Sequence, residues 1–212
     1  RDLWDASGRL GNYGKVLRVL ALTGQRKGEV AGMQWRDLDL DKKVWLLKKD
    51  QTKAKRANEI PLSPKVLEII ENQPRVKGVN LVFPGKGGKK ISGWSKHKEK
   101  LEREMRCLLA ELTPDEYWML TKHGLKNSER PARAAIKEKI GETDFEEFDI
   151  HDFRRTAATE MARAKTPEVV VQLILNHSAK PVLGVTGIYN RYGYAAEMRE
   201  ALDNWAERLM SI

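Results

Sequence analysis

The sequence predicts a mainly α-helical α+β fold with one small three-stranded antiparallel sheet. Three observations support this class. Apolar residues recur at helical spacing over most of the chain, Ser-Pro or Thr-Pro pairs mark three helix starts, and between residues 37 and 62 the apolar period changes to two, as in strands. The chain has 212 residues, 41% of them hydrophobic, which suits a single domain over residues 1–212 with a sizeable core.

The elements follow from these patterns in chain order. Helices are expected over 12–22, 26–34, from 64 onward, 95–112, 115–122, 151–164, 168–175 and 195–211. Strands are expected over 37–40, 44–47 and 59–62. The basic segment 48–58 then forms the turn between the last two strands, and the glycine-rich segment 84–88 is expected to be a flexible loop.

The charge of the chain is positive and unevenly distributed. The net charge is +9, and residues 1–93 alone hold 20 Lys and Arg against 10 Asp and Glu, whereas the remainder is close to neutral. A surplus concentrated in one part of the chain favours a surface that binds a polyanion, most often a nucleic acid. Its densest stretch contains Lys48, Lys49, Lys53, Lys55 and Arg56.

Composition also excludes several classes of protein. No run of about 18 apolar residues occurs, so we expect no membrane segment. The single cysteine, Cys107, cannot form an internal disulfide, which favours a reducing compartment. The chain begins at Arg1 without a signal peptide, and we interpret it as a fragment of a longer protein.

Several short motifs contain residues suited to phosphate chemistry. His151 and Arg154 are three positions apart on an expected helix and so share a face. Arg26 lies between two glycines at a helix start, where backbone N–H groups favour anions, and Lys53 lies on the expected hairpin turn. A tyrosine is a plausible nucleophile toward a phosphodiester when cations lie nearby. Each motif taken alone is more often an ordinary surface or packing feature.

The order of these motifs is more specific than any one of them. Thr23-Gly24-x-Arg26-x-Gly28-Glu29, then Lys53 before the strand end at Ile60-Pro61-Leu62, then His151-Asp152-Phe153-Arg154, then Leu175-Asn176-His177-Ser178, and finally Gly187-Ile188-Tyr189-Asn190-Arg191 follow one another. From about residue 20 to the C-terminus, this arrangement resembles the catalytic domain of the tyrosine recombinase (phage integrase) family, in particular integrases of prophages and genomic islands.

The resemblance implies a role for each candidate catalytic residue in a strand transfer that needs no metal, nucleotide or other cofactor. Two arginines would bind the non-bridging oxygens of the phosphate, a histidine would add a hydrogen bond, a tyrosine would attack, and a lysine would protonate the leaving oxygen. A further histidine would serve as base or hold the tyrosine in line. These residues are, in that order, Arg26, Arg154, His177, Tyr189, Lys53 and His151. Glu29 would support Arg26 without touching the substrate.

The resemblance also implies the partners. Double-stranded DNA at attachment sites is the expected substrate, contacted by Lys27, Lys48, Lys49, Lys55, Arg56, Lys86, Lys89, Lys90 and Arg155. The family acts as a homotetramer on DNA, so the apolar seam of the helix 195–211 could dock on a neighbouring protomer; packing on its own domain is the alternative. We expect the family's N-terminal core-binding domain to lie outside this fragment, and the stretch 106–148, which is longer than usual, to be an insertion. The resemblance also implies a location in the bacterial cytoplasm, in association with the nucleoid.

Two departures from the family pattern are visible. Asn176 occupies the position of the family's usual glycine, and His177 and Tyr189 are twelve residues apart, which is more than in many relatives. Tyr192 and Tyr194 also lie close to the expected nucleophile. Three other functions stay open: a type IB topoisomerase, a DNA-binding module that has lost catalysis, and a metal-dependent nuclease built on Asp149, His151 and Asp152.

Overall fold

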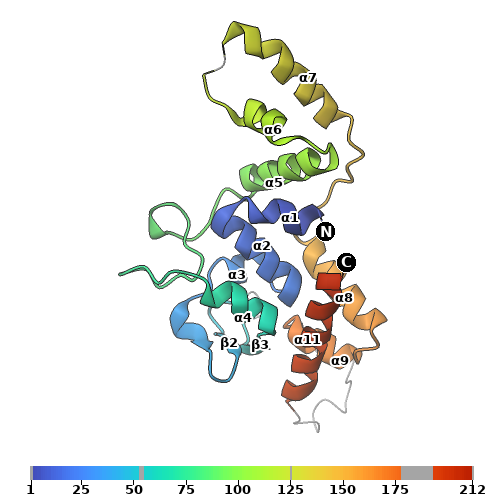
Figure 1. Cartoon of the computed structure of the whole chain (residues 1–212). Coiled ribbons are helices and arrows are strands. Elements are labelled where there is room, and N and C mark those ends of the chain that lie inside the picture. Colours follow the sequence, from blue (N-terminus) through green and yellow to red (C-terminus); the bar gives the residue numbers. More distant parts are fainter. Residues whose placement is uncertain (1, 53–54, 125, 178–192, 212) are drawn as a thin grey trace. The chain divides into compact units, whose positions relative to one another are not determined.

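The computed structural model describes residues 2–52, 55–124, 126–177 and 193–211. It is mostly helical with one three-stranded antiparallel sheet, which confirms the expected fold class. The chain divides into two compact units (Figure 1). Unit 1 contains residues 1–14 and 93–148, and unit 2 contains residues 15–92 and 149–212. None of the helices in the described ranges is long and apolar enough to cross a membrane.

Unit 1 is built from four helices. Their bounds are α1 Asp2–Gly8, α5 Trp94–Leu109, α6 Pro114–Thr121 and α7 Arg130–Gly141. Helix α6 begins as the Thr113-Pro114 pair predicts: Thr113 Oγ1 accepts a hydrogen bond from Glu116 N, and the Glu116 carboxylate accepts one from Thr113 N in return. The sequence analysis missed α1 and left the region of α7 unassigned.

The expected insertion 106–148 lies within unit 1 and has its own hydrophobic core. That core contains Cys107, Ala110, Leu120, Ile136 and Ile140. Beside it the buried Glu104 carboxylate accepts a hydrogen bond from Tyr117 Oη at 2.8 Å and lies 3.5 Å from Arg9 Nη1. Because Arg9 belongs to the N-terminal segment, this buried charge links that segment to the rest of unit 1.

Unit 2 contains the sheet and the remaining helices. The helices are α2 Gly11–Thr23, which begins in unit 1, α3 Lys27–Val30, α4 Pro64–Glu71, α8 Asp152–Arg163, α9 Glu168–Ile174 and α11 Ala195–Ser211. The expected helix 26–34 was too long: it ends at Val30, and successive tight turns carry the chain through Gly32 to Met33. The segment 84–88, expected to be a loop, contains a single 3₁₀ turn.

The sheet has the order β1-β2-β3, with β1 Leu38–Asp39, β2 Val44–Leu47 and β3 Asn58–Pro61. All pairs are antiparallel, and Trp45 of β2 lies opposite Leu38 of β1 and Ile60 of β3. Along β2, Trp45 and Leu47 are buried, whereas Leu46 between them is exposed, which is the period-two alternation read from the sequence. The sheet thereby holds both ends of the β2–β3 turn in register.

Helix α11 packs on its own unit. It contacts α8, α9 and β3, and its seam residues Met198, Leu202 and Trp205 are buried (Figure 1). The Trp205 indole Nε1 donates a hydrogen bond of 2.8 Å to the carbonyl of Ala21 in α2. The structure therefore has the arrangement that the sequence analysis gave as the alternative, in which the helix packs on its own domain.

We predict that Trp205→Phe lowers the free energy of unfolding by about 2 kcal/mol, because it leaves the buried Ala21 carbonyl without its donor and opens a cavity. Urea denaturation measures the change. Met210→Leu on the exposed side of the same helix is the matched control and should stay within about 0.5 kcal/mol of the wild type. Equal stabilities for wild type and Trp205→Phe would contradict the packing described here.

Candidate active site

The candidate site is organised around the C-terminal end of helix α9. There, His177 N donates to the carbonyl of Gln172 at 2.8 Å and Asn176 N donates to the carbonyl of Leu173 at 2.9 Å. This pair of bonds is the Schellman motif, which requires its penultimate residue to be left-handed. Asn176 has φ +49°, a conformation that glycine and asparagine tolerate best. The departure from the family's usual glycine is therefore conformationally permitted.

Three consecutive carbonyls at this helix end accept hydrogen bonds from three different segments. Helix ends leave such carbonyls without partners inside the helix. Asn58 Nδ2 of β3 donates to the carbonyl of Leu173 at 2.9 Å, and Gln25 Nε2, just after α2, donates to that of Ile174 at 2.8 Å. Arg154 Nη2 of α8 donates to that of Leu175. The helix end thus joins the segments that contain the candidate residues.

Arg154 is buried, with 4% of its surface exposed. Besides its bond to Leu175, its Nη1 donates to the carbonyl of Gly24 at 2.8 Å. Gly24 has φ +64°, and a Cβ there would lie 3.1 Å from a Leu175 methyl group, so both conformation and space call for glycine. Burial, together with the nearby charge of Arg26, lowers the pKa of Arg154 to about 10, while Glu29 opposes that shift. The guanidinium therefore stays charged at neutral pH.

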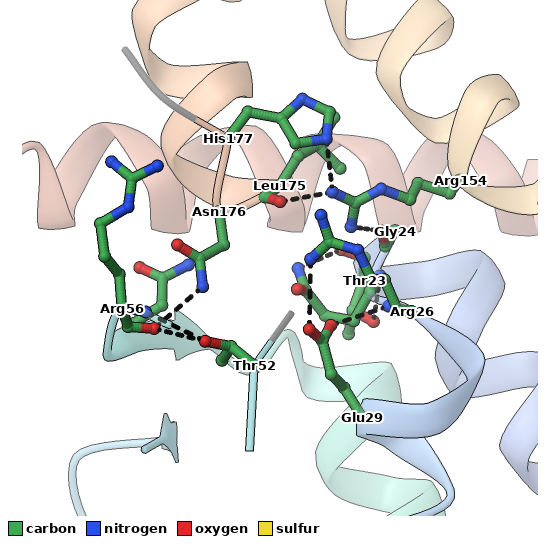
Figure 2. A network of polar contacts seen from close by, with 12 residues as sticks. Thr23, Gly24, Arg26, Glu29, Thr52, Arg56, Arg154, Leu175, Asn176 and His177 are labelled. Atoms are coloured by element: carbon green, nitrogen blue, oxygen red, sulfur yellow. Dashed lines mark hydrogen bonds and ion pairs between the residues drawn. The ribbon is translucent and has the colours of Figure 1, made fainter. Parts of the chain in front are cut away.

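Arg26 is held by Glu29, as the sequence analysis expected. Arg26 N donates to Glu29 Oε2 at 3.0 Å, and Arg26 Nη1 lies 3.2 Å from Glu29 Oε1. Glu29 is itself buried, whereas 24% of the Arg26 side chain is exposed. The guanidiniums of Arg26 and Arg154 and the imidazole of His177 lie around one region (Figure 2). The carboxylate balances only part of their charge, so this region attracts anions.

His177 is neutral in this arrangement. Arg154 Nη2 lies 2.8 Å from its Nε2, and because a guanidinium can only donate, Nε2 must accept. The ring proton is then on Nδ1, which lies 3.0 Å from Gln172 Oε1. Burial, and then the charges of Arg154, Arg26 and His151, lower the pKa of His177. To donate to a phosphate oxygen, the ring has to take up a second proton.

His151 lies at the N-cap position of α8 with its side chain exposed. The two carboxylates beside it are engaged in local turns: Asp152 Oδ2 accepts from Asp149 N, and Asp149 Oδ1 accepts from His151 N. Within the described ranges, no group of three or more His, Cys, Asp or Glu side chains could hold a metal ion. The geometry around α8 thus gives these acidic residues a capping role.

Two candidate catalytic residues, Lys53 and Tyr189, lie outside the described residues, as does the alternative nucleophile Tyr192. The segment before Lys53, up to Thr52, is described. Lys48 Nζ at the start of the turn lies 2.6 Å from the buried Asp37 carboxylate, and Gln51 Nε2 donates to the same group at 2.7 Å. Tyr194 precedes α11, where its carbonyl accepts from Met198 N.

All nine predicted DNA-contacting residues are exposed. Three of them also make contacts within unit 2: Lys48 pairs with Asp37, Arg155 lies 3.1 Å from Asp152, and Lys90 Nζ donates to the carbonyl of Gly28 at 2.5 Å. The remaining six are Lys27, Lys49, Lys55, Arg56, Lys86 and Lys89.

Four polar residues that shape the site were not singled out from the sequence. Gln25, Asn58 and Gln172 act through long-range or helix-end contacts, which leave no local signature. Asp37 could have been found from the sequence, because it belongs to the Trp35-x-Asp37 segment that follows the arginine motif. The structure shows it buried and paired with Lys48.

We predict that in the protein free of DNA at pH 7 the His177 ring is neutral with its proton on Nδ1, which ¹⁵N NMR of the imidazole detects directly. Because its folded pKa lies below the unfolded value of 6.5, its contribution to stability is present above pH 6.5 and declines as the pH falls. His177→Asn should flatten this part of the pH–stability curve. A proton on Nε2, or a ring pKa at or above 6.5, would contradict the assignment.

Comparison with known proteins identifies the family. Residues 12–194 match the sequence model of the phage integrase family. The chain is 24% identical over 197 residues to an integrase of Shigella phage Sf6, covering 92% of this chain and 40% of that protein. It is 25% identical over 198 residues to the prophage integrase IntZ of Escherichia coli (strain K12), covering 93% of this chain and 39% of that protein.

The chain spans about two fifths of the length of these relatives, whereas the family match extends over most of the chain, from α2 to the start of α11. It also includes every residue of the pocket described above. This chain therefore belongs to the phage integrase family.

Proposed function

We propose that this chain carries the strand-transfer site of a site-specific DNA recombinase of the tyrosine type. The observation that supports this most directly is the convergence of Arg26, Arg154 and His177 on one region, with Glu29 holding Arg26 in place. Planar guanidinium donors fixed by buried partners suit the two non-bridging oxygens of a phosphodiester.

In this proposal the pocket acts on the transition state. Negative charge accumulates on the non-bridging oxygens as the phosphorus is attacked, and Arg26 and Arg154 stabilise it by donors that are already oriented. A phosphate nearby also favours the charged form of His177. His177 then takes a proton, turns Nε2 into a donor and keeps its Nδ1 bond to Gln172. Binding of the anion thereby makes His177 a third donor beside Arg26 and Arg154.

The covalent step assigns roles to Tyr189, Lys53 and His151 from their positions in the sequence motifs. The Tyr189 oxygen forms a bond to phosphorus and gives up its proton, with His151 as base, while the bond from phosphorus to the 5′ oxygen breaks. Lys53 donates the proton that this leaving oxygen needs. The products are a 3′-phosphotyrosyl bond and a free 5′-hydroxyl, and attack by the 5′-hydroxyl of a partner strand reverses the step, so no nucleotide is consumed.

Double-stranded DNA at attachment sites is the substrate in this proposal. The exposed basic residues of the β2–β3 turn and the 84–90 segment would contact phosphates, which position a protein on DNA but carry no sequence information. Each lost contact would lower the slope of log affinity against log salt by about 1.

The proposal predicts a covalent protein–DNA adduct on a nicked duplex containing an attachment site, formed in the presence of EDTA. Peptide mapping should locate the link at Tyr189, and Tyr189→Phe should form no adduct while binding the same DNA. Tyr194→Phe, next to the start of α11, is the matched control and should react normally.

The alternatives give different results in this assay and in companion assays on supercoiled DNA and on pairs of sites. An adduct at Tyr192 or Tyr194 would retain the chemistry and change the nucleophile. Adduct formation with relaxation of supercoils but without joining of two sites would indicate a type IB topoisomerase. No adduct on a site that the protein demonstrably binds would indicate a DNA-binding module, and cleavage that EDTA abolishes would indicate a metal-dependent nuclease.

We further propose that the active assembly is a homotetramer on DNA that exchanges helix α11 between protomers. Exchange would replace the contacts of Trp205 with Ala21 by the same contacts in a neighbouring chain, as in domain swapping.

A photo-crosslinking residue at position 205 tests the exchange. It should link two chains in the presence of attachment-site DNA and form only links within one chain in its absence, as denaturing gels measure. The same residue at the exposed position 210 is the control. Exclusively intrachain links on DNA would contradict the exchange, and a mass of fewer than four chains per DNA complex would contradict the tetramer.

A further inference from the structure

Two asparagine side chains join the β2–β3 hairpin to the end of helix α9 in opposite directions. Asn58 Nδ2 of β3 donates to the carbonyl of Leu173 at 2.9 Å. Asn176 Nδ2 donates to the carbonyl of Arg56 at 3.2 Å (Figure 2). The residues of each pair are 115 and 120 positions apart in the chain. Such a reciprocal pair fixes both the separation and the relative orientation of the two backbones.

The Arg56 carbonyl is the point at which the hairpin turn closes. Thr52 Oγ1 accepts a hydrogen bond from Arg56 N at 3.1 Å and donates to Arg56 O at 2.8 Å. The same oxygen accepts the Asn176 amide, so both of its lone pairs are used. Thr52 is buried, and together with Arg56 it bounds the three residues between them, the first of which is Lys53.

The backbone at position 176 does not require an asparagine side chain. The left-handed conformation at φ +49° is available to glycine at no steric cost. The asparagine amide therefore contributes something besides the turn. It is buried, with 7% of the residue exposed, and its bond to Arg56 is the contact that a glycine would lack.

We propose that Asn176 is a positioning residue that sets the placement of the lysine-bearing turn relative to the phosphate pocket. Its peptide bond leads directly to His177, whose imidazole contacts Arg154, while its side chain holds the closing residue of the turn. Asn176 thus fixes the position of the turn that contains Lys53, the proposed proton donor, relative to the side chains that bind the phosphate. The inference rests on the proposed role of Lys53 as the acid that protonates the leaving 5′ oxygen.

Such a coupling matters because proton donation depends on close approach. A general acid must come within hydrogen-bond distance of the leaving oxygen, and a displacement of about 1 Å can slow a step by about 100-fold. Asn176→Gly keeps the left-handed turn and removes only the amide, so it should leave the pocket intact. We expect it to slow cleavage of ordinary DNA by about 10- to 100-fold.

The discriminating substrate is a nicked duplex with sulfur in place of the bridging 5′ oxygen, in a site located by footprinting of the full-length protein. A thiolate leaves without being protonated, so this substrate does not need the acid. Asn176→Gly should cleave it at the wild-type rate. Lys53→Ala should show the same pattern, with a larger loss on ordinary DNA.

Two further variants keep the comparison interpretable. Asn176→Asp also tolerates the left-handed conformation but presents only acceptors to the Arg56 carbonyl, so it should reproduce the defect and the rescue even if Asn176→Gly is poorly folded. Lys165→Gly is the matched control, because Lys165 is another left-handed residue after a helix end, with φ +63°. It should cleave both substrates normally. Thermal melting and DNA binding are measured for every variant.

The outcomes separate this inference from the proposed function. Wild-type cleavage of ordinary DNA by both Asn176 variants would overturn the inference, and so would an equal loss on the two substrates, which would indicate a structural role. If Lys53→Ala is not rescued by the sulfur substrate whereas Asn176→Gly is, the assignment of Lys53 fails and Asn176 positions another acid.

Discussion

The burial of the end of helix α9 is the constraint on which the site depends. Its last carbonyls have no partners within the helix, and a buried carbonyl left unpaired costs about 1–3 kcal/mol. Side chains from the segment after α2, from β3 and from α8 supply the donors, namely Gln25, Asn58 and Arg154. Because each donor is close in sequence to a candidate catalytic residue or is one, satisfying the helix end also brings Arg26, the hairpin and Arg154 together. Folding and assembly of the site are then a single event.

The same arrangement determines how charge is distributed. Arg154 uses both terminal nitrogens of its guanidinium on carbonyls and on His177, and its burial works against its charge. Glu29 is the carboxylate nearby, and it is engaged with Arg26. A buried cation beside a second cation favours the arrival of an anion, since the anion restores solvation that the protein has removed. For the proposed DNA substrate, this means that the pocket is prepared for a phosphate before binding.

The fold could be predicted from the sequence wherever its signal is local. The Thr113-Pro114 start of α6 and the alternation of buried Trp45 and Leu47 with exposed Leu46 depend on adjacent residues and were read correctly. Helix α7 was not recognised, because its buried face consists of little more than Ile136 and Ile140. Of the site, the motifs indicated the arginines and His177, which the structure brings together. They could not indicate Gln25 or Asn58, whose partners are backbone carbonyls about 150 and 115 positions away, because a carbonyl acceptor looks the same at every residue.

The long segment of unit 1 contributes differently from unit 2. Lengthening a connection between two elements costs little chain entropy. Here the segment also packs around its own core at Cys107, which is separate from the packing that supports the pocket. Burial raises the pKa of the Cys107 thiol, which makes it a core residue rather than a reactive one. Unit 1 holds 13 Lys and Arg against 14 Asp and Glu, whereas unit 2 holds 26 against 16. The attraction for a polyanion therefore belongs to the unit that contains the phosphate pocket, and any contact of unit 1 with DNA has to depend on individual side chains rather than on net charge.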